Sequence, residues 1–412
     1  MLCVASSGIA AILLTGGRTS HSRFKIPLSI DEASSCYIIR GTPLADLILQ
    51  TALIIWDEVP MQHRHCFEAV DRALRDIRQE DSLFGGIPVI LGGDFAQIPP
   101  VIRNGDRPEI VNASIRQSFI WNYIQTIHLR INMRVRGNSV DAIHFKDWLY
   151  RMTYSPEYQN TTIGLPNYIH TTTSLDSLIS QVYPEDLLAN TANRSQELYK
   201  SAILATRNIT VDEINEKILE AMPGISLRLV SADSVEESDD DDEVFQLTPE
   251  YLQTITPNGF PPARLTLKVG CIVMLLRNLN PTVGLCNGTR LMILEIGSYV
   301  LKVLVLKNIS DAAEHIEFIP RITLLTLEGE YPFILRRTQF PVKLSFAMTI
   351  NKSQGQSLEN VGIDLRHSAF THGQLYVALS RSTNVSSIYV LQSEESLLNT
   401  VQNVVYPELL LE

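Results

Sequence analysis

The chain has 412 residues, of which 45% are hydrophobic and 19% charged, and its net charge at pH 7 is −11. This length allows two to four domains with a sizeable core, and the composition is that of an ordinary globular protein. No apolar run approaches the ~18 residues of a membrane-spanning helix. The first positive charge is Arg18, so the N-terminal stretch lacks the basic region of a signal peptide.

Five scattered cysteines without C-x-x-C spacing disfavour a disulfide framework or a zinc site and predict an intracellular protein. Much of the negative charge lies in the run EESDDDDE at residues 236–243, and removing its seven charges from −11 leaves −4. Such runs are usually disordered and solvated. The net charge therefore neither supports nor excludes a groove that binds DNA.

The first 130 residues alternate strand-like and helical patterns, which predicts an α/β fold with a parallel sheet. The candidate strands are 2–6, 53–58 and 87–93, and residues 67–77 have the apolar spacing of a helix.

A second α/β segment is expected from a strand at 201–208 and a helix at 211–219, and it resumes near residue 343. Residues 265–306 are instead rich in short β-like pieces. Their turns, NPTVG and CNGT, contain glycines suited to positive φ. These features predict a small β-barrel inserted into the second α/β unit.

Asp57 and Glu58 follow the apolar run of the second candidate strand. Two carboxylates at the end of a buried strand are typical of nucleotide hydrolases, where one binds magnesium and the next polarises the attacking water. On this stretch alone a solvated strand end is an equally good interpretation.

The string GGDFAQIPPV at residues 92–101 follows the next strand. Its glycines allow close backbone approach and its prolines fix the exit of the chain. We expect Asp94 and Gln97 at the same sheet edge as Asp57, where a neutral amide can contact a γ-phosphate. A turn with incidental polar residues is the alternative.

Arg134 and Arg381 each follow an apolar stretch, and a guanidinium group from a neighbouring domain can neutralise charge on a transferred phosphoryl group. For either arginine alone, a surface salt bridge is the simpler interpretation. The stretch TINKSQGQSLE at 349–359 suits hydrogen bonding to a nucleic-acid backbone. Its alternative is a helix N-cap at Asn351 or Ser353.

The triplet His63-Arg64-His65, with Glu68 nearby, raises the alternative of a metal-dependent hydrolase or nuclease. Helical geometry would direct the two histidines to different faces. We therefore favour a solvated start of the helix at 67–77.

Together these strings resemble the Pif family of ATP-dependent 5′-to-3′ DNA helicases in superfamily 1, most closely the branch of Helitron transposon helicases. The resemblance covers nearly the whole chain and six motifs in order. The matching strings are SSGIAAILLTGGRTSHSRFKIP for motif Ia, IIWDEVPM for motif II, GGDFAQIPPV for motif III, LRINMR for motif IV, AMTINKSQGQSL for motif V and GQLYVALSR for motif VI.

The resemblance implies two RecA-like parallel-sheet domains, with a small SH3-like β-barrel inserted in the second. The expected domains are residues 1–128, then 129–220 with 335–412, and 221–334 as an acidic linker and the insert. It also implies ATP and Mg²⁺ as cofactors, and translocation on single-stranded and forked DNA. A monomeric, nuclear protein of DNA repair, recombination and telomere maintenance is expected.

The resemblance further assigns site residues. Asp57 is expected to bind the metal, Glu58 to act as general base, and Gln97 to contact the γ-phosphate. Nucleotide contacts are also expected from Asp94 and Gly355, and Arg134 and Arg381 are expected to act as arginine fingers. The expected nucleic-acid contacts are Ser7, Gly8, Thr19, His21, Asn351, Lys352, Ser353 and Gln354.

One family motif is missing, because no glycine of the chain is followed by lysine and G-x-x-x-x-G-K-[ST] does not occur. In the family this phosphate loop precedes motif Ia, so we expect a truncated gene model or a decayed transposon copy with weak or no activity. The alternative function is a non-catalytic remnant that binds single-stranded DNA. The genomic sequence upstream of codon one tests the truncation.

Overall fold

The computed structural model describes residues 1–129, 131–137, 139–236, 247–307, 314–327, 329–394 and 399–410. The chain divides into two compact units. The first unit comprises Met1–Leu178, Leu204–Arg207 and Thr349–Glu412, and the second comprises Ile179–Ile203 and Asn208–Met348. The seven acidic residues of the run begin at Glu236, and residues 237–243 of that run lie outside the described part of the chain.

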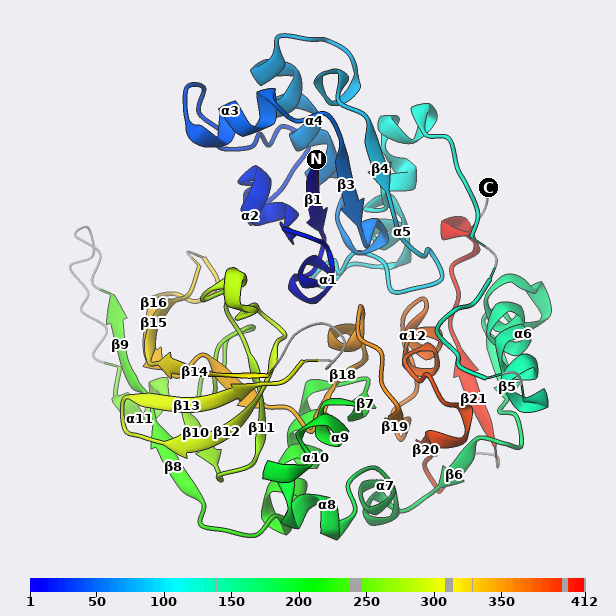
Figure 1. Cartoon of the computed structure of the whole chain (residues 1–412), viewed down its shortest axis with the longest axis vertical. Coiled ribbons are helices and arrows are strands. Elements are labelled where there is room, and N and C mark those ends of the chain that lie inside the picture. Colours follow the sequence, from blue (N-terminus) through cyan, green and yellow to red (C-terminus); the bar gives the residue numbers. More distant parts are fainter. Residues whose placement is uncertain are drawn as a thin grey trace. The chain divides into compact units, whose positions relative to one another are not determined.

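The first unit begins with a four-stranded parallel sheet in the order β2-β1-β3-β4. Its strands are β1 (Leu2–Ala5), β2 (Arg18–Thr19), β3 (Ile54–Asp57) and β4 (Val89–Leu91). The helices of this part are α1 (Gly8–Leu13), α2 (Ser20–Phe24), α3 (Pro43–Leu49), α4 (Arg64–Arg78) and α5 (Arg107–Asn112) (Figure 1). The predicted strands and the helix over 67–77 are confirmed, with α4 longer by three residues at its start and one at its end.

The core of this sheet is centred on Trp56, which is completely buried. Its ring lies 5.5 Å from that of Phe24 and 4.5 Å from that of Phe67, measured between centroids. Phe67 and Leu74 are on the buried face of α4, as the apolar spacing predicts. This packing fixes β3 against α4 and so fixes the position of the acidic residues that end β3.

The remainder of the first unit contains a second parallel sheet, in which β19 (Asn360–Asp364) pairs with β20 (Ile388–Leu391) and β20 pairs with β6 (His170–Thr172). A separate antiparallel ribbon joins β5 (Thr161–Gly164) to β21 (Thr400–Asn403). Helix α6 (Val140–Tyr154) packs on α12 (Gln374–Ser380). The chain passes between the two units within α7 (Leu175–Val182), β7 (Ser201–Ala205) and β18 (Ala347–Thr349).

The second unit contains an antiparallel sheet in the order β14-β13-β12-β11-β17, as the β-rich sequence predicts. These strands are β11 (Ile272–Leu275), β12 (Arg290–Ile296), β13 (Val300–Val305), β14 (His315–Pro320) and β17 (Val342–Leu344). The smaller sheets use β8 (Leu227–Val230), β9 (Ala232–Glu236), β10 (Arg264–Leu267), β15 (Ile322–Leu325) and β16 (Ile334–Gln339). The helices are α8 (Glu185–Ala189), α9 (Ser195–Tyr199), α10 (Asn208–Ala221) and α11 (Pro249–Leu252).

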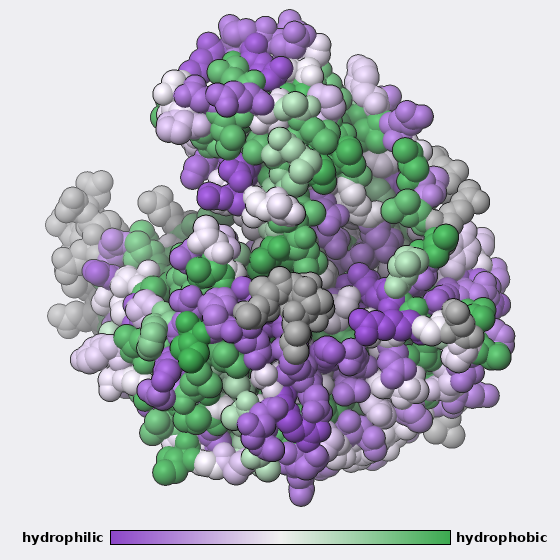
Figure 2. All heavy atoms as spheres, viewed as in Figure 1, coloured by the Kyte–Doolittle hydropathy of each residue, from purple (hydrophilic) through white to green (hydrophobic). Residues whose placement is uncertain are grey.

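The predicted SH3-like character of this insert and the three domain boundaries stay predictions. Within the described residues, no helix is long and apolar enough to cross a bilayer. On the face of the molecule in Figure 2, hydrophilic and hydrophobic residues are intermingled. All five cysteines are buried and free, as expected for reduced thiols.

Candidate functional site

The acidic pair lies where β3 ends and the chain turns. Asp57 is the last residue of the strand, and its Oδ1 accepts a hydrogen bond of 2.9 Å from the backbone N–H of Glu58. Glu58 has a left-handed backbone with φ of 54°, which a residue other than glycine adopts rarely and at an energetic cost. This turn brings both half-buried carboxylates to the carboxyl edge of the sheet.

The loop after β4 approaches this turn closely. A Cβ atom at Gly93 would lie 2.3 Å from Cδ of Pro60, and one at Gly92 would lie 2.9 Å from Oδ1 of Asp57. Only glycine fits at these two positions, as the sequence predicts. The loop then places Asp94 beside Gln97, whose backbone N–H donates to the Asp94 carbonyl across 3.0 Å.

Gln97 is 5% exposed, and its Oε1 accepts no hydrogen bond from any residue that the structure describes. A buried amide oxygen without a donor is costly, and such an atom is often completed by water or a ligand. The amide therefore has the capacity for one more partner at the sheet edge, next to the carboxylates.

Helix α12 and the turn before it contact this loop through two side chains that precede Arg381. The Tyr376 hydroxyl donates to Oδ2 of Asp94 across 2.9 Å. His372 is completely buried, and its Nε2–H donates to the Phe95 carbonyl across 2.8 Å while its Nδ1 accepts from the backbone N–H of Tyr406. Burial lowers the pKa of His372 to about 4, so the neutral tautomer that these two bonds require is the stable one.

Arg381 is the C-cap of α12 and is completely buried. Its guanidinium donates to the carbonyls of Val377 and Gln356 at 3.1 and 3.2 Å. Arg134 contacts the same helix end, because its Nη1 donates to the Ser380 carbonyl across 3.4 Å. The two predicted arginines therefore meet at one end of α12.

The electrostatics of these groups are coupled. Burial raises the pKa of Glu58 above its ordinary value, and the carboxylates of Asp57 and Asp94 act in the same direction. The guanidinium groups of Arg381 and Arg134 act against this rise. Burial, followed by the charge of Arg134, lowers the pKa of Arg381 to about 9. A carboxylate with a raised pKa near two cations is suited to accept a proton from a water molecule.

Asp57, the residue expected to hold Mg²⁺, fits that ion as a single protein ligand. Asp57 offers a hard carboxylate oxygen at a strand end, which suits magnesium. The described residues contain no group of three or more histidine, cysteine, aspartate or glutamate side chains that could hold a metal by themselves. This donor set matches the usual magnesium site, in which one carboxylate, waters and substrate phosphates share the coordination.

The expected DNA contacts of motif Ia lie at two short turns. Ser7 is the N-cap of α1 and accepts from the Ala10 N–H, and Thr19 is the N-cap of α2. His21 is half-buried, and burial lowers its pKa. Both turns are tied to the loop after β3 by Gln62, whose Oε1 accepts from the hydroxyls of Ser6 at 3.0 Å and Ser20 at 2.9 Å.

The expected contacts of motif V lie on a single 3₁₀ turn at Ile350–Ser353 and just after it. Asn351 and Lys352 are half-buried there, whereas Ser353 is completely buried and its hydroxyl donates to the Ile350 carbonyl. The N-cap of this turn is Thr349, so the alternative of a cap at Asn351 or Ser353 is wrong.

Gln354 and Gly355 lie on the side of the turn that contacts the loop after β4 and helix α1. Gln354 is 4% exposed, and its Nε2 lies 3.4 Å from the Ile98 carbonyl, to which it donates. A Cβ at Gly355 would lie 3.7 Å from the backbone nitrogen of Ala10, beside α1. Gly8 begins α1 itself. The roles of all these residues stay proposals.

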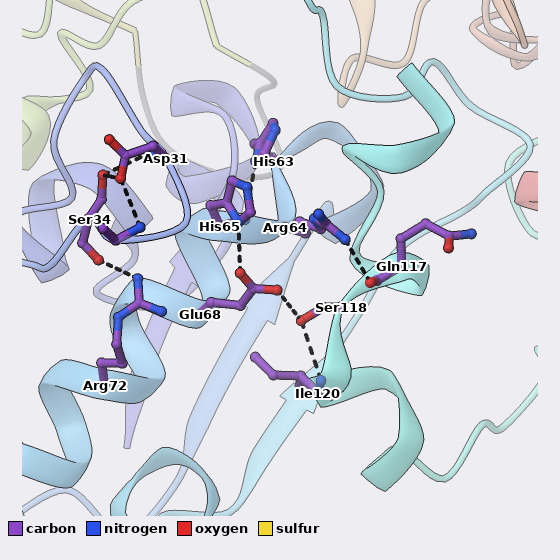
Figure 3. Close-up of polar contacts among 11 residues, drawn as sticks. Asp31, Ser34, His63, Arg64, His65, Glu68, Arg72, Gln117, Ser118 and Ile120 are labelled. Carbon is purple, nitrogen blue, oxygen red and sulfur yellow. Dashed lines mark hydrogen bonds and ion pairs between the residues drawn. The ribbon is translucent and has the colours of Figure 1, made fainter. Parts of the chain in front are cut away.

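The histidine triplet forms a separate network at the start of α4 (Figure 3). Nδ1 of His65 lies 2.7 Å from a carboxylate oxygen of Glu68, whose other oxygen accepts from the Ser118 hydroxyl at 2.7 Å. Burial opposes ionisation of Glu68, but these two hydrogen bonds hold its pKa below the ordinary value. Glu68 is 6% exposed, so the interpretation of a solvated helix start is wrong for this residue.

The argument that His63 and His65 point to different faces is also wrong. Their ring centroids lie 4.6 Å apart. The reason is that His63 is the N-cap of α4, with extended backbone, so helical spacing does not apply to the pair. The His65 ring is already bonded to Glu68 (Figure 3).

Sequence reasoning missed three residues of the site, which are His372, Gly373 and Tyr376. A Cβ at Gly373, where φ is +72°, would lie 2.4 Å from the Ala96 carbonyl. The string THGQLY does contain a glycine directly before a helix, but only the structure shows that motif III fills the space beside it. These residues attach α12 to the loop that carries Asp94 and Gln97.

Comparison with known proteins agrees with this geometry. Residues 1–157 match the PIF1-like helicase family model, and residues 250–296 match the model for the 2B domain of DNA helicase Pif1. Over these two ranges the chain is similar to Pif1-like helicases. The resemblance stated from the six motifs is thereby confirmed at the level of the family, and the Helitron branch stays a prediction.

Relatives in this family include the human ATP-dependent DNA helicase PIF1, which is 28% identical over 95% of this chain and 54% of its own length. The Danio rerio helicase of the same name is 29% identical over 97% of this chain and 55% of its own length. The Pif1-like chain described here thus spans about half the length of these relatives.

Solved Pif1 structures share the fold. The Bacteroides Pif1 helicase in complex with ADP-AlF3 and single-stranded DNA has a TM-score of 0.64 at 24% identity, over 94% of this chain and 82% of that one. The Candida albicans enzyme has a TM-score of 0.61 at 22% identity, over 95% and 84%. This likeness confirms the predicted α/β fold with two RecA-like parallel-sheet domains.

Proposed function

We propose that the chain is the motor of an ATP-dependent 5′-to-3′ DNA helicase that acts on single-stranded and forked DNA. The observation that carries this proposal is the convergence of Glu58, Arg134 and Arg381 at one site in the first unit, where both arginines hold down the pKa of Glu58 and the charge of Arg134 lowers the pKa of Arg381. The Bacteroides relative bound to ADP-AlF3 and single-stranded DNA supports ATP and DNA as the ligands.

The chain's own residues divide the chemistry. The Glu58 carboxylate accepts the proton of the attacking water, and the Gln97 amide orients that water or a phosphate oxygen. Arg134 and Arg381 neutralise the charge that develops on the transferred phosphoryl group. The hydrogen bond between Asp94 and Tyr376 holds α12 against this loop, and this contact fixes the position of Arg381 relative to the loop. Mg²⁺, with Asp57 as its ligand, would supply further positive charge at the phosphates.

Turnover by these 412 residues should be slow, because no G-x-x-x-x-G-K-[ST] loop occurs among them to bind the β- and γ-phosphates. Ser7, Thr19, His21 and the motif V turn are the proposed contacts with single-stranded DNA. A monomeric nuclear enzyme, with roles in DNA repair, recombination and telomere maintenance, follows as a proposal from the family.

A second candidate is a remnant of the same fold that binds single-stranded DNA without turnover, favoured by the missing phosphate loop. Phosphate release by the 412-residue chain, measured with and without single-stranded DNA, separates the two. DNA-stimulated release above the ATP background supports the helicase. DNA binding without release supports the remnant, and the absence of both DNA binding and ATP turnover would contradict both.

A further inference from the structure

A polar cavity of about 250 Å³ lies in the first unit, and its lining includes none of the carboxylates and arginines of the candidate site. Its lining residues lie just after the carboxyl ends of β19 and β20 and on the β5–β21 ribbon. Figure 1 shows where these strands lie in the fold. The lining residues are Thr162, Leu365, Ser368, Ala369, Gln392, Thr400, Val401 and Gln402. At about 30 Å³ per water molecule, this space corresponds to roughly eight waters, which is enough for one small planar group.

The lining offers hydrogen-bonding groups without charge. Gln392 is 6% exposed, and its Nε2 donates to the Thr400 carbonyl across 2.7 Å. The Oε1 of Gln392 accepts no hydrogen bond from the described residues. Gln402 uses its Oε1 to accept from the Thr162 hydroxyl, while its Nε2 donates to none of the described atoms. The cavity thus presents an amide acceptor, an amide donor and the Ser368 hydroxyl.

The position of the cavity agrees with ligand binding. In open α/β sheets, ligands bind in crevices outside the carboxyl ends of the parallel strands. The loop that follows β19 carries both Ser368 and His367, and the His367 carbonyl accepts from the Thr206 hydroxyl at the end of β7. The cavity is therefore part of the carboxyl edge of the second parallel sheet.

We propose that this cavity binds one nucleobase of single-stranded DNA. A phosphate, a carboxylate or a cation would find no charged partner in the lining, whereas a base presents donors and acceptors along one edge and an apolar face. Leu365, Ala369 and Val401 supply the apolar contacts for that face. The inference rests on the proposed function, because it takes single-stranded DNA as the ligand.

The test compares two strands of equal phosphate number, an eight-residue oligothymidine and an eight-residue strand of abasic sites. Binding is measured by fluorescence anisotropy. Ser368→Leu fills the mouth of the cavity, and Gln402→Leu removes the amide at similar volume. Both positions lie at the surface or are half-buried, so the fold should tolerate them. The matched control is His367→Leu, on the same loop and exposed but not lining the cavity.

We expect Ser368→Leu and Gln402→Leu to weaken oligothymidine binding about tenfold, as for the loss of one well-seated base. Binding of the abasic strand should not change, and His367→Leu should match the unsubstituted chain with both strands. If both cavity variants bind oligothymidine as the unsubstituted chain does, or weaken both strands alike, the base site is refuted while the helicase proposal stands. If the unsubstituted chain binds neither strand, DNA as its ligand is refuted.

Discussion

The Tyr376 hydroxyl donates a hydrogen bond of 2.9 Å to Oδ2 of Asp94, and this bond connects residues 282 positions apart. Asp94 lies on the loop that also carries Gln97, and Tyr376 lies on α12, whose C-cap is Arg381. One phenol therefore connects the amide and the arginine that the motifs assign to the same phosphate. The phenol carries no charge, so this hydrogen bond is not an ion pair. Its main effect is to orient the loop that carries Asp94.

Substituting Tyr376→Phe should lower the free energy of unfolding by about 1–3 kcal/mol, because the half-buried Asp94 carboxylate loses its best donor. Its remaining contact with the Gln97 amide is long, at 3.5 Å. Urea unfolding at pH 7 measures the change. The matched control is Tyr37→Phe, since that side chain is 77% exposed. The free energy of unfolding of this variant should equal that of the unsubstituted chain within error.

Substituting Gly373→Ala should destabilise the first unit more than a positive φ alone explains. The new Cβ would meet the Ala96 carbonyl at 2.4 Å, and backbone cannot give way as a flexible side chain can. The control is Gly41→Ala, where φ is +77° and nothing lies within 4 Å of the added atom. We expect an excess of about 1–3 kcal/mol for Gly373→Ala in urea unfolding. Equal losses of stability in the two variants would show that the loop carrying Ala96 can move away from the added atom.

The buried His372 should make stability fall in acid. Its folded pKa is about 4 and its ordinary value is 6.5, so between these values the unfolded chain binds the proton more readily. Stability is then complete above pH 6.5 and is lost as the pH falls toward 4, by at most about 3 kcal/mol. The charged groups near His372 are Asp94, Arg107 and Glu408.

Urea unfolding from pH 7 to pH 4 measures this loss, with His372→Gln as the reference because it keeps all other titrating groups. The unsubstituted chain should lose more stability over the window than the variant does. Parallel curves for the two proteins would mean that His372 takes up a proton in the folded protein as readily as in the unfolded chain. That result would contradict its hydrogen bonds to Phe95 and Tyr406.

Substituting Arg381→Met should raise the pKa of Glu58. Among the opposing charges, Arg381 is the larger influence holding that pKa down and Arg134 is the smaller. Methionine preserves much of the volume and removes the charge. A ¹³C NMR titration of the glutamate side-chain carboxyls should show one resonance whose titration midpoint shifts to higher pH. Arg136→Met, which removes an arginine 72% exposed at its side chain, is the control and should leave that resonance unchanged.

The sequence predicted the residues of the site better than it predicted the tertiary contacts that hold α12 against the loop of Asp94. Strand-end acids at Asp57 and the Gly-rich loop before Asp94 are local patterns, since both follow buried strands and meet at one sheet edge. The contacts of His372 and Tyr376 with that loop are tertiary, and a histidine before a helix and a tyrosine within it carry no local sign of their partners.

The errors have a similar origin. His63 and His65 were assigned helical geometry, but His63 caps α4 with extended backbone, and this brings the rings together. Glu68 was expected to be solvated, because a carboxylate in the second turn of a helix usually is. Its burial depends on Ser118, fifty residues later, which no pattern within α4 reveals.

The central claim is that Glu58 serves as the base of a nucleotide-hydrolysing site. The most direct measurement is phosphate release from ATP in the presence of single-stranded DNA, comparing the unsubstituted chain with Glu58→Gln and with the control Glu32→Gln, at an exposed glutamate of the same unit. We predict slow, DNA-stimulated release that Glu58→Gln abolishes and Glu32→Gln leaves intact. Release that persists in Glu58→Gln at the unsubstituted rate would contradict the account.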